Sequence, residues 1–243
     1  MFRNIENWFR NKEVVGRASG PSESEPTSHP EYARGSILES FEGRSLEAYI
    51  KEFNIKLEDL QGNTILDLGA SLKNKFAEEL KQRGVEAKVI SLSPDFSDQT
   101  ISQQTKEASP EGQLVAGLGQ NLPFADNTFD KIYSLHAHEH FKTLQDVYNA
   151  LKEMARTLKK GGIAKMGPIY DIPNYSHIFQ QYSEDTNLKS LLAQYEVTFE
   201  REDVSPDLPP VKVKDDAANA FYVMGYCLVI RKNMKESSPT EAQ

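Results

Sequence analysis

The chain has 243 residues, enough for one sizeable α/β domain with its own core but too few for two full-sized domains to be expected. Hydrophobic residues make up 38% and charged residues 26% of the sequence, and the formal net charge is -8. A surface with a net negative charge repels phosphate backbones, so the composition disfavours nucleic acid as a substrate.

One cysteine and the apolar runs narrow the class of protein further. Cys227 is the only cysteine, which excludes an intramolecular disulfide and a cysteine-based zinc cluster. No signal-peptide pattern is found, so we expect a cytoplasmic protein. The longest apolar stretch, "FYVMGYCLVI" at 221–230, is about half as long as a membrane-spanning helix and is rich in aromatic and β-branched residues. It predicts a single buried strand.

The two ends of the sequence differ from its centre. Residues 1–17 begin "MFRNIENWFRNK", where Phe2, Ile5, Trp8 and Phe9 recur at helical spacing. This predicts an amphipathic segment that contacts a protein or a membrane surface. Residues 18–31 are rich in serine, proline and glutamate and predict a flexible linker, and residues 234–243 predict a disordered tail. The domain itself is expected at 32–233.

Strand and helix patterns alternate through this domain. Helical spacing is seen at 36–53, 74–83, 144–158 and 175–195, and strand patterns at 64–69, 87–92, 113–118, 129–136, 162–169, 196–202 and 221–231. Such alternation predicts an α/β fold with a doubly wound, mostly parallel, seven-stranded Rossmann-like sheet. The stretch between the second and third strands has few core residues, so a short element is expected there.

The last two strand patterns have no helix between them. The connecting stretch contains prolines and charges, which predicts a late hairpin and hence a C-terminal antiparallel strand. In sheets of this kind, ligands bind at the carboxyl ends of the strands. The loops after Leu68, Leu92, Leu118 and Leu135 should therefore line the site.

Three segments resemble one enzyme family. They are "ILDLGAS" at 65–71, "LPFADNTFDKIYSLHAHEHF" at 122–141 and "EMARTLKKGGIAKMGPI" at 153–169. In this order they resemble the class I S-adenosylmethionine-dependent methyltransferases, particularly the type 11 group. The likeness by motif covers about residues 60–168, and it implies S-adenosylmethionine as the cofactor.

The resemblance also implies which residues contact the cofactor. Asp67 would lie near the cofactor's ammonium, with small residues that let the backbone approach closely. Three positions depart from the family pattern: Lys73 replaces a glycine, Ser91 replaces the acid that binds the ribose hydroxyls, and Leu118 replaces the acid at the adenine. The implied cofactor-binding residues are Asp67, Gly69, Ala70, Ser71, Ser91, Leu92, Leu118, Gly119, Gln120 and His136.

The stretch "HAHEH" at 136–140 places three imidazoles at alternate positions. Such spacing is compatible with a metal site if the strand continues. Histidine is common in the family at the positions of His136 and His140, so we expect no metal. His138 and His140 are the candidate general bases, because an imidazole titrates near neutrality; a structural role for each stays open.

These features favour transfer of a methyl group from S-adenosylmethionine to an oxygen, nitrogen or carbon of a small-molecule acceptor. One alternative is a catalytically inactive methyltransferase-like protein that binds a partner or acts as a scaffold. A third possibility is that the pocket binds a different nucleotide-like ligand. The sequence lacks the asparagine-proline-proline-aromatic motif used by many methyltransferases of base and amide nitrogens. A nucleic-acid partner is therefore not expected.

Overall fold

The computed structural model describes residues 43–70, 74–108, 112–141, 143–170, 186–203, 211–214, 220–223 and 225–234. The predicted amphipathic segment, the linker and residues 235–243 of the tail lie outside these ranges, as do Ser71 and Lys73. The boundaries of the domain therefore stay predictions. Within the described residues, no helix is both long and apolar enough to cross a membrane.

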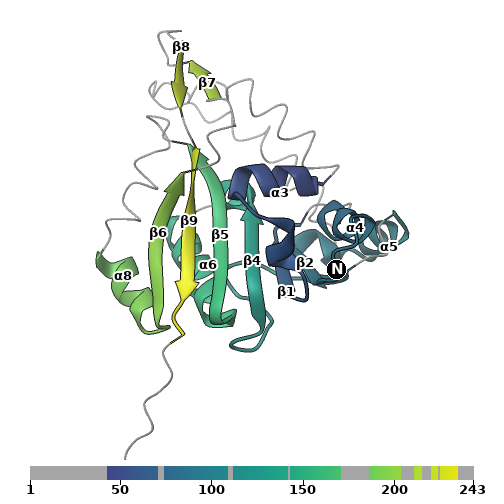
Figure 1. Cartoon of the computed structure of the whole chain (residues 1–243), viewed down its shortest axis with the longest axis horizontal. Coiled ribbons are helices and arrows are strands. Elements are labelled where there is room, and N and C mark those ends of the chain that lie inside the picture. Colours follow the sequence, from purple (N-terminus) through teal and green to yellow (C-terminus); the bar gives the residue numbers. More distant parts are fainter. Residues whose placement is uncertain are drawn as a thin grey trace, which may run out of the picture.

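Seven strands form one sheet in the order β3-β2-β1-β4-β5-β9-β6 (Figure 1). The first five run parallel, whereas β9 is antiparallel to both β5 and β6, which confirms the predicted fold class. The bounds are β1 Thr64–Leu68, β2 Lys88–Ser93, β3 Gln113–Ala116, β4 Phe129–Leu135, β5 Leu158–Tyr170, β6 Val197–Asp203 and β9 Gly225–Lys232.

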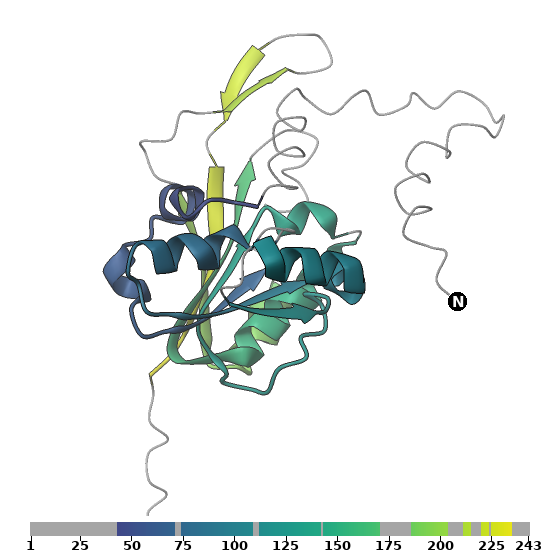
Figure 2. The same cartoon turned by 90° about the vertical axis from the view of Figure 1, so that its right-hand side faces the viewer.

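Helices cover both faces of this sheet (Figure 2). The α-helices are α3 Leu46–Phe53, α4 Lys75–Gln82, α5 Gln99–Ala108, α6 Leu144–Thr157 and α8 Thr186–Ala193, and the 3₁₀ helices are η1 Leu57–Leu60, η2 Pro94–Ser97 and η3 Ala137–His140. Side chains of α3 and α4 share one hydrophobic cluster, and those of α6 and α8 share the other. The sheet therefore has a core on each side.

The alternation of side chains along β1 shows how the two cores are divided. Ile65 joins the cluster under α3 and α4, whereas Leu66 and Leu68 join the cluster under α6 and α8. Because successive strand residues point to opposite faces, a strand buried on both sides reads as a continuous apolar run. Asp67 points to the same face as Ile65, and it is the one acid in this run.

The prediction of one strand at 221–231 was wrong. Its first part is β8 (Ala220–Val223), which pairs with β7 (Val211–Lys214) in a separate two-stranded sheet. Only β9, from Gly225, enters the main sheet. The apolar run continues through both strands, so hydrophobic pattern alone contains no boundary between them.

The element between β2 and β3 is longer than expected. Helix α5 has ten residues and follows η2, although the sequence predicts a short element. Its exposed side chains include Gln103 and Glu107, which form a hydrogen bond of 2.8 Å one turn apart. The side chain of Thr105 is buried, whereas the apolar contact here comes from Phe96 in η2. A mostly polar helix of this kind leaves little periodic signal.

The turn before β4 is attached to α6 through one guanidinium. Arg156 donates to the carbonyl oxygens of Leu122 (3.1 Å) and Phe124 (2.9 Å) and to the carboxylates of Asp126 (2.6 Å) and Glu153 (2.7 Å). A planar guanidinium can satisfy several acceptors at once, which an ammonium cannot. The "LPFAD" turn is therefore held in place from α6.

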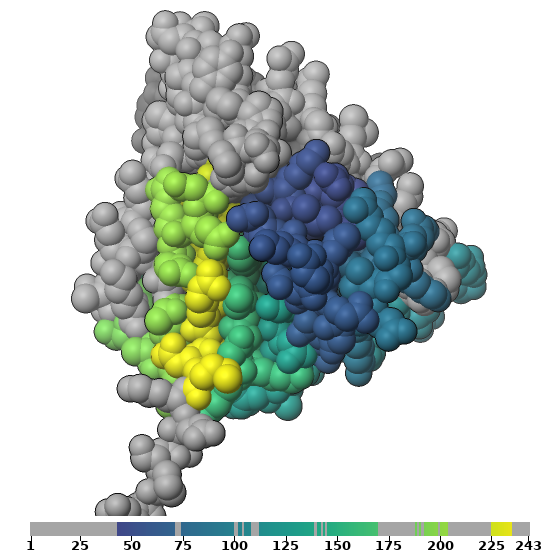
Figure 3. Space-filling model, in the orientation of Figure 1, coloured from purple at the N-terminus to yellow at the C-terminus, as the bar shows by residue number. Residues whose placement is uncertain are grey.

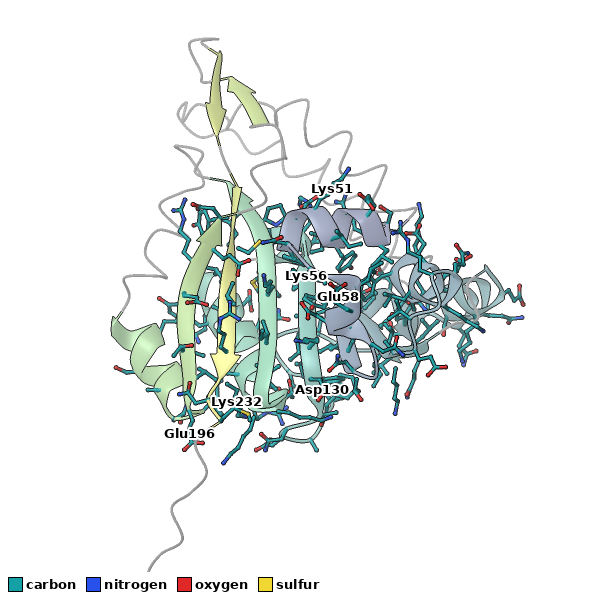
Figure 4. The ribbon with its side chains drawn as sticks, viewed as in Figure 1. Lys51, Lys56, Glu58, Asp130, Glu196 and Lys232 are labelled. Atoms are coloured by element: carbon teal, nitrogen blue, oxygen red, sulfur yellow. The ribbon has the colours of Figure 1, made fainter. Side chains whose placement is uncertain are left out.

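The amino-terminal end of the sheet has further polar contacts of this kind (Figure 4). Lys232 at the end of β9 donates to the carbonyl oxygen of Ala155 (3.0 Å), near the end of α6. Asp130 accepts hydrogen bonds of 2.8 Å from the Thr64 backbone and from Lys159. In Figure 4, Asp130 and Lys232 lie at the opposite end of the sheet from α3. This end has a structural role.

We predict that Arg156→Lys lowers the free energy of unfolding by about 2 kcal/mol, because a lysine leaves backbone carbonyls of the turn without donors. Urea unfolding measures the change. The matched control is Arg83→Lys. Among the described residues, the Arg83 side chain forms only an exposed pair with Glu47 at 3.6 Å, and such pairs contribute roughly 0 to 1 kcal/mol. Equal losses in the two variants would contradict this role.

Candidate functional site

The loop after β1 joins three strand ends at the carboxyl edge of the sheet. The N–H groups of Gly69 and Ala70 both donate to the carbonyl oxygen of Leu92, at 2.9 and 3.1 Å. Gly69 has φ of +83°, and a Cβ placed there would lie 2.3 Å from Cβ of Ala137. Glycine is therefore required for both conformation and space. The ends of β1, β2 and β4 converge at this loop.

Asp67, two residues before Gly69, is buried with 2% of its surface exposed. The Tyr49 hydroxyl, from α3, donates to its Oδ1 at 2.6 Å. Burial raises the pKa of Asp67 to about 7, and the hydrogen bond from Tyr49 opposes this shift. Burial also raises the pKa of the Tyr49 phenol well above its usual value, so the phenol stays a donor.

An aromatic cluster surrounds this pair. The Tyr49 ring stacks on Phe76 of α4 with centroids 4.3 Å apart, and it meets Tyr133 of β4 edge-on at 6.4 Å. Phe53 stacks on Tyr133 at 5.7 Å. Such packing fixes the ring of Tyr49, and hence the direction of its hydroxyl. Sequence periodicity predicts Tyr49 as a core residue but does not reveal its polar partner.

Ser91 faces the interior of the protein. It is fully buried, and its hydroxyl donates to Oδ1 of Asn74, the residue before α4. Asn74 has φ of +44°, a conformation that asparagine tolerates better than most residues. The hydroxyl of Ser91 is therefore used within the protein, whereas the resemblance implies a ribose contact here. The sequence analysis missed Asn74, because only the fold brings it to Ser91.

The segment at 118–120 presents an apolar surface. Leu118 is 52% exposed, and its carbonyl oxygen accepts from the backbone of Asn121 at 3.1 Å. Gly119 is buried, and a Cβ there would lie 3.4 Å from side-chain atoms of Leu68 and Phe141. Gln120 is half-buried. An exposed leucine beside a close-packed glycine suits a flat, apolar ligand group at this place.

His136 has a left-handed backbone conformation at the end of β4, with φ of +60°. Its N–H donates to the carbonyl oxygen of Gly167 in β5 at 2.8 Å. Its Nε2 lies 3.1 Å from Oε2 of Glu52 in α3. Non-glycine residues adopt this conformation rarely, and such residues cluster at functional sites. Glu52 was not predicted as a site residue, and no local motif indicates it.

The two candidate bases lie in η3, where the chain leaves the sheet. His138 is buried with 6% exposure, whereas His140 is exposed. Because the segment is a 3₁₀ helix, the three histidines do not share one face, as an extended strand would require. Among the described residues, no three His, Cys, Asp or Glu side chains are grouped as metal ligands. The catalytic roles of His138 and His140 stay predictions.

A hollow of about 420 Å³ lies elsewhere, between α4 and the start of β2. Leu80, Val85 and Val89 are among the residues that line it. Its lining residue Val89 is at the start of β2, whereas Leu92, which bonds to Gly69, is near the end of that strand. We therefore assign the candidate site to the carboxyl edge.

Comparison with known proteins identifies similar methyltransferases. Residues 66–166 match the family model described as "Methyltransferase domain". The sterol 24-C-methyltransferase erg6 of Aspergillus fumigatus is 32% identical over 127 residues, covering 48% of this chain and 32% of the relative. The demethylmenaquinone methyltransferase of Corynebacterium urealyticum is 31% identical over 131 residues, covering 52% and 51%. The chain thus spans about a third to a half of the length of these relatives.

The fold is also found among solved structures. A TehB-like S-adenosylmethionine-dependent methyltransferase from Corynebacterium glutamicum superposes with a TM-score of 0.51 at 17% identity, covering 83% of this chain and 96% of that one. At this level of identity the similarity concerns the fold alone.

We predict that Asp67 makes stability depend on pH. The folded carboxyl keeps its proton to about pH 7, whereas an unfolded aspartate loses it near pH 3.9. Stability should therefore fall as pH rises from about 4 to 7, by up to about 1.4 kcal/mol per pH unit, and Asp67→Asn should remove this slope. Urea unfolding at several pH values measures it. The control Asp59→Asn, at an exposed position, should keep the wild-type slope; a steep slope in Asp67→Asn would contradict the prediction.

Proposed function

We propose that this protein is a class I S-adenosylmethionine-dependent methyltransferase that methylates a small-molecule acceptor, because residues 66–166 match the methyltransferase-domain model. The observation that carries the proposal is the loop at Gly69. It needs a residue without a side chain, and it lies where the ends of three parallel strands meet. Parallel sheets bind nucleotide-like ligands at this edge.

Several described residues fit the cofactor. Gly69 and Ala70 offer close backbone approach, and Asp67 lies beside them as the acid nearest this loop along β1. Leu118 and Gly119 offer an apolar wall for the adenine. Bound here, the cofactor would supply an activated methyl group. The chain's own contribution would be to orient that group towards the acceptor and to exclude water.

Two features oppose tight binding. The hydroxyl of Ser91 is already bonded to Asn74, and Leu118 offers no side-chain acceptor to the adenine amino group. Each missing hydrogen bond costs roughly 0.5 to 3 kcal/mol of affinity. Their sum would weaken binding, although backbone groups at Gly119 and Gln120 offer other contacts. The alternative of an inactive scaffold gains no support from the relatives, which are named as methyltransferases.

The acceptor is proposed as a small molecule in the cytoplasm. The relatives are named for sterols and demethylmenaquinone, which supports a small molecule over a macromolecule. If the acceptor carries a proton on oxygen or nitrogen, His140 is the better placed of the two candidate bases, because it is exposed whereas His138 is buried. Contact of residues 1–17 with a protein or membrane remains part of this proposal.

We predict that wild-type protein binds S-adenosylmethionine with a Kd in the micromolar range, about -8 kcal/mol, and that Gly69→Ala weakens binding at least tenfold. The new Cβ would collide with Ala137. Isothermal titration calorimetry measures both. The matched control is Gly62→Ala, since Gly62 also has a positive φ (+74°) but has no atom within 4 Å of a new Cβ. Absence of binding by the wild type at millimolar ligand, or equal binding by both variants, would contradict the proposal.

A further inference from the structure

Helix α3 directs two polar side chains, one turn apart, at the carboxyl edge. Tyr49 contacts Asp67, and Glu52 contacts His136. Residues three apart lie on the same side of a helix. Figure 1 shows α3 lying across the carboxyl-terminal half of β4 and β5. Because Asp67 lies in β1 and His136 directly follows the neighbouring strand β4, this side of α3 spans the candidate site.

Glu52 lies close to the cofactor loop. His136, its partner, is followed in the chain by Ala137, the residue that a Cβ at position 69 would meet. On the other side, Tyr49 contacts Asp67, two residues before the same glycine. Glu52 and Tyr49, one turn apart on α3, thus contact residues on either side of the Gly69 loop.

The last turn of α3 is held in a fixed position. Nζ of Lys165 in β5 donates to the carbonyl oxygen of Phe53 at 2.7 Å, and Sγ of Cys227 in β9 donates to that of Glu52 at 3.3 Å. A cation at the carboxyl end of a helix also interacts favourably with the helix dipole. Figure 3 shows β6 and β9 at the surface beside the segment that contains α3. The backbone of Glu52 is thus bonded to the sheet that carries the site.

The carboxylate of Glu52 has an unused oxygen. Its Oε2 faces His136, and among the described residues no donor contacts Oε1 and no lysine or arginine pairs with Glu52. Nζ of Lys165, which donates to the carbonyl oxygen of Phe53, lies 2.6 Å from Glu202 and is already paired. The side chain of Glu52 is only 17% exposed. Its partner His136 is a cation only when protonated. A positively charged ligand would therefore offset the cost of burying this carboxylate.

We propose that Glu52 is the counter-charge for a cationic centre of S-adenosylmethionine, and that His136 is the positioning residue that orients it. This inference rests on the proposed function. The cofactor has two cationic centres, the ammonium of its amino-acid part and the sulfonium. Asp67 also has one oxygen engaged, by Tyr49, but it is only 2% exposed. Glu52, with a side chain 17% exposed, is the more accessible of the two carboxylates.

The test is calorimetric titration of the full chain with three ligands. S-adenosylmethionine carries both cations, S-adenosylhomocysteine carries only the ammonium, and 5′-methylthioadenosine carries neither. Glu52→Gln should lower the affinity for S-adenosylmethionine at least fivefold and should change the affinity for 5′-methylthioadenosine by less than twofold. S-adenosylhomocysteine keeps its affinity if the sulfonium is the partner and loses it if the ammonium is. The control Glu47→Gln makes the same charge change at an exposed site of α3. It should change the affinity for each of the three ligands by less than twofold.

Two other outcomes would overturn the inference. If Glu52→Gln lowers the affinity for all three ligands equally, Glu52 only supports the fold. If the affinity for S-adenosylmethionine is unchanged, Glu52 is not part of the site. Either result overturns the inference while the proposed function stands. If the wild type binds none of the ligands, the proposed function fails and the inference fails with it.

A second variant tests the role of His136. His136→Asn removes the imidazole, and asparagine tolerates the left-handed backbone found there. If His136 acts through Glu52, the two substitutions should be non-additive: the double variant should bind S-adenosylmethionine within twofold of Glu52→Gln alone. Additive losses would overturn the positioning role.

Discussion

The hydrogen bond from Tyr49 to Asp67 is the contact on which the carboxyl edge depends. It places a carboxyl group inside an aromatic cluster, where a lone charge is disfavoured, and provides the donor that makes this burial tolerable. One turn along the same helix, Glu52 contacts His136. Helix α3 therefore completes an edge that β1 and β4 alone would leave with buried polar groups lacking partners.

The two ends of the sheet differ in how completely their polar groups are satisfied. At the amino end, the side chains of Asp130, Arg156 and Lys232 form hydrogen bonds with backbone N–H and C=O groups. At the carboxyl end, Gly69 leaves its backbone accessible, Leu118 is exposed, and one oxygen of Glu52 has no donor among the described residues. Incomplete satisfaction of this kind is expected where a ligand supplies the missing partners.

Local sequence patterns were sufficient to predict the α/β class, the parallel strands and the antiparallel strand near the end of the chain, because buried parallel strands and amphipathic helices have distinct periods. They were insufficient for the boundary between β8 and β9, where one apolar run serves two sheets, and for α5, whose exposed surface is polar. In both cases the deciding interactions are tertiary.

The same limit applies to the site. The "DLGA" loop and its glycine follow from a local motif, and the structure brings Gly69 to Leu92 and Ala137. The pairs Glu52 with His136 and Ser91 with Asn74 join residues that are 84 and 17 positions apart. No spacing rule connects such residues, so the resemblance to a family could indicate the position of Ser91 but not the partner that engages its hydroxyl.

Hydrogen–deuterium exchange of the full chain, with and without S-adenosylmethionine, tests most directly whether α3 and the strand ends form one binding site. Ligand should slow exchange in α3 (Leu46–Phe53) and at the end of β4 together with η3, because these elements share the contacts around Gly69 and His136. Slowing confined to other parts of the domain, or no change in α3 at saturating ligand, would contradict this account.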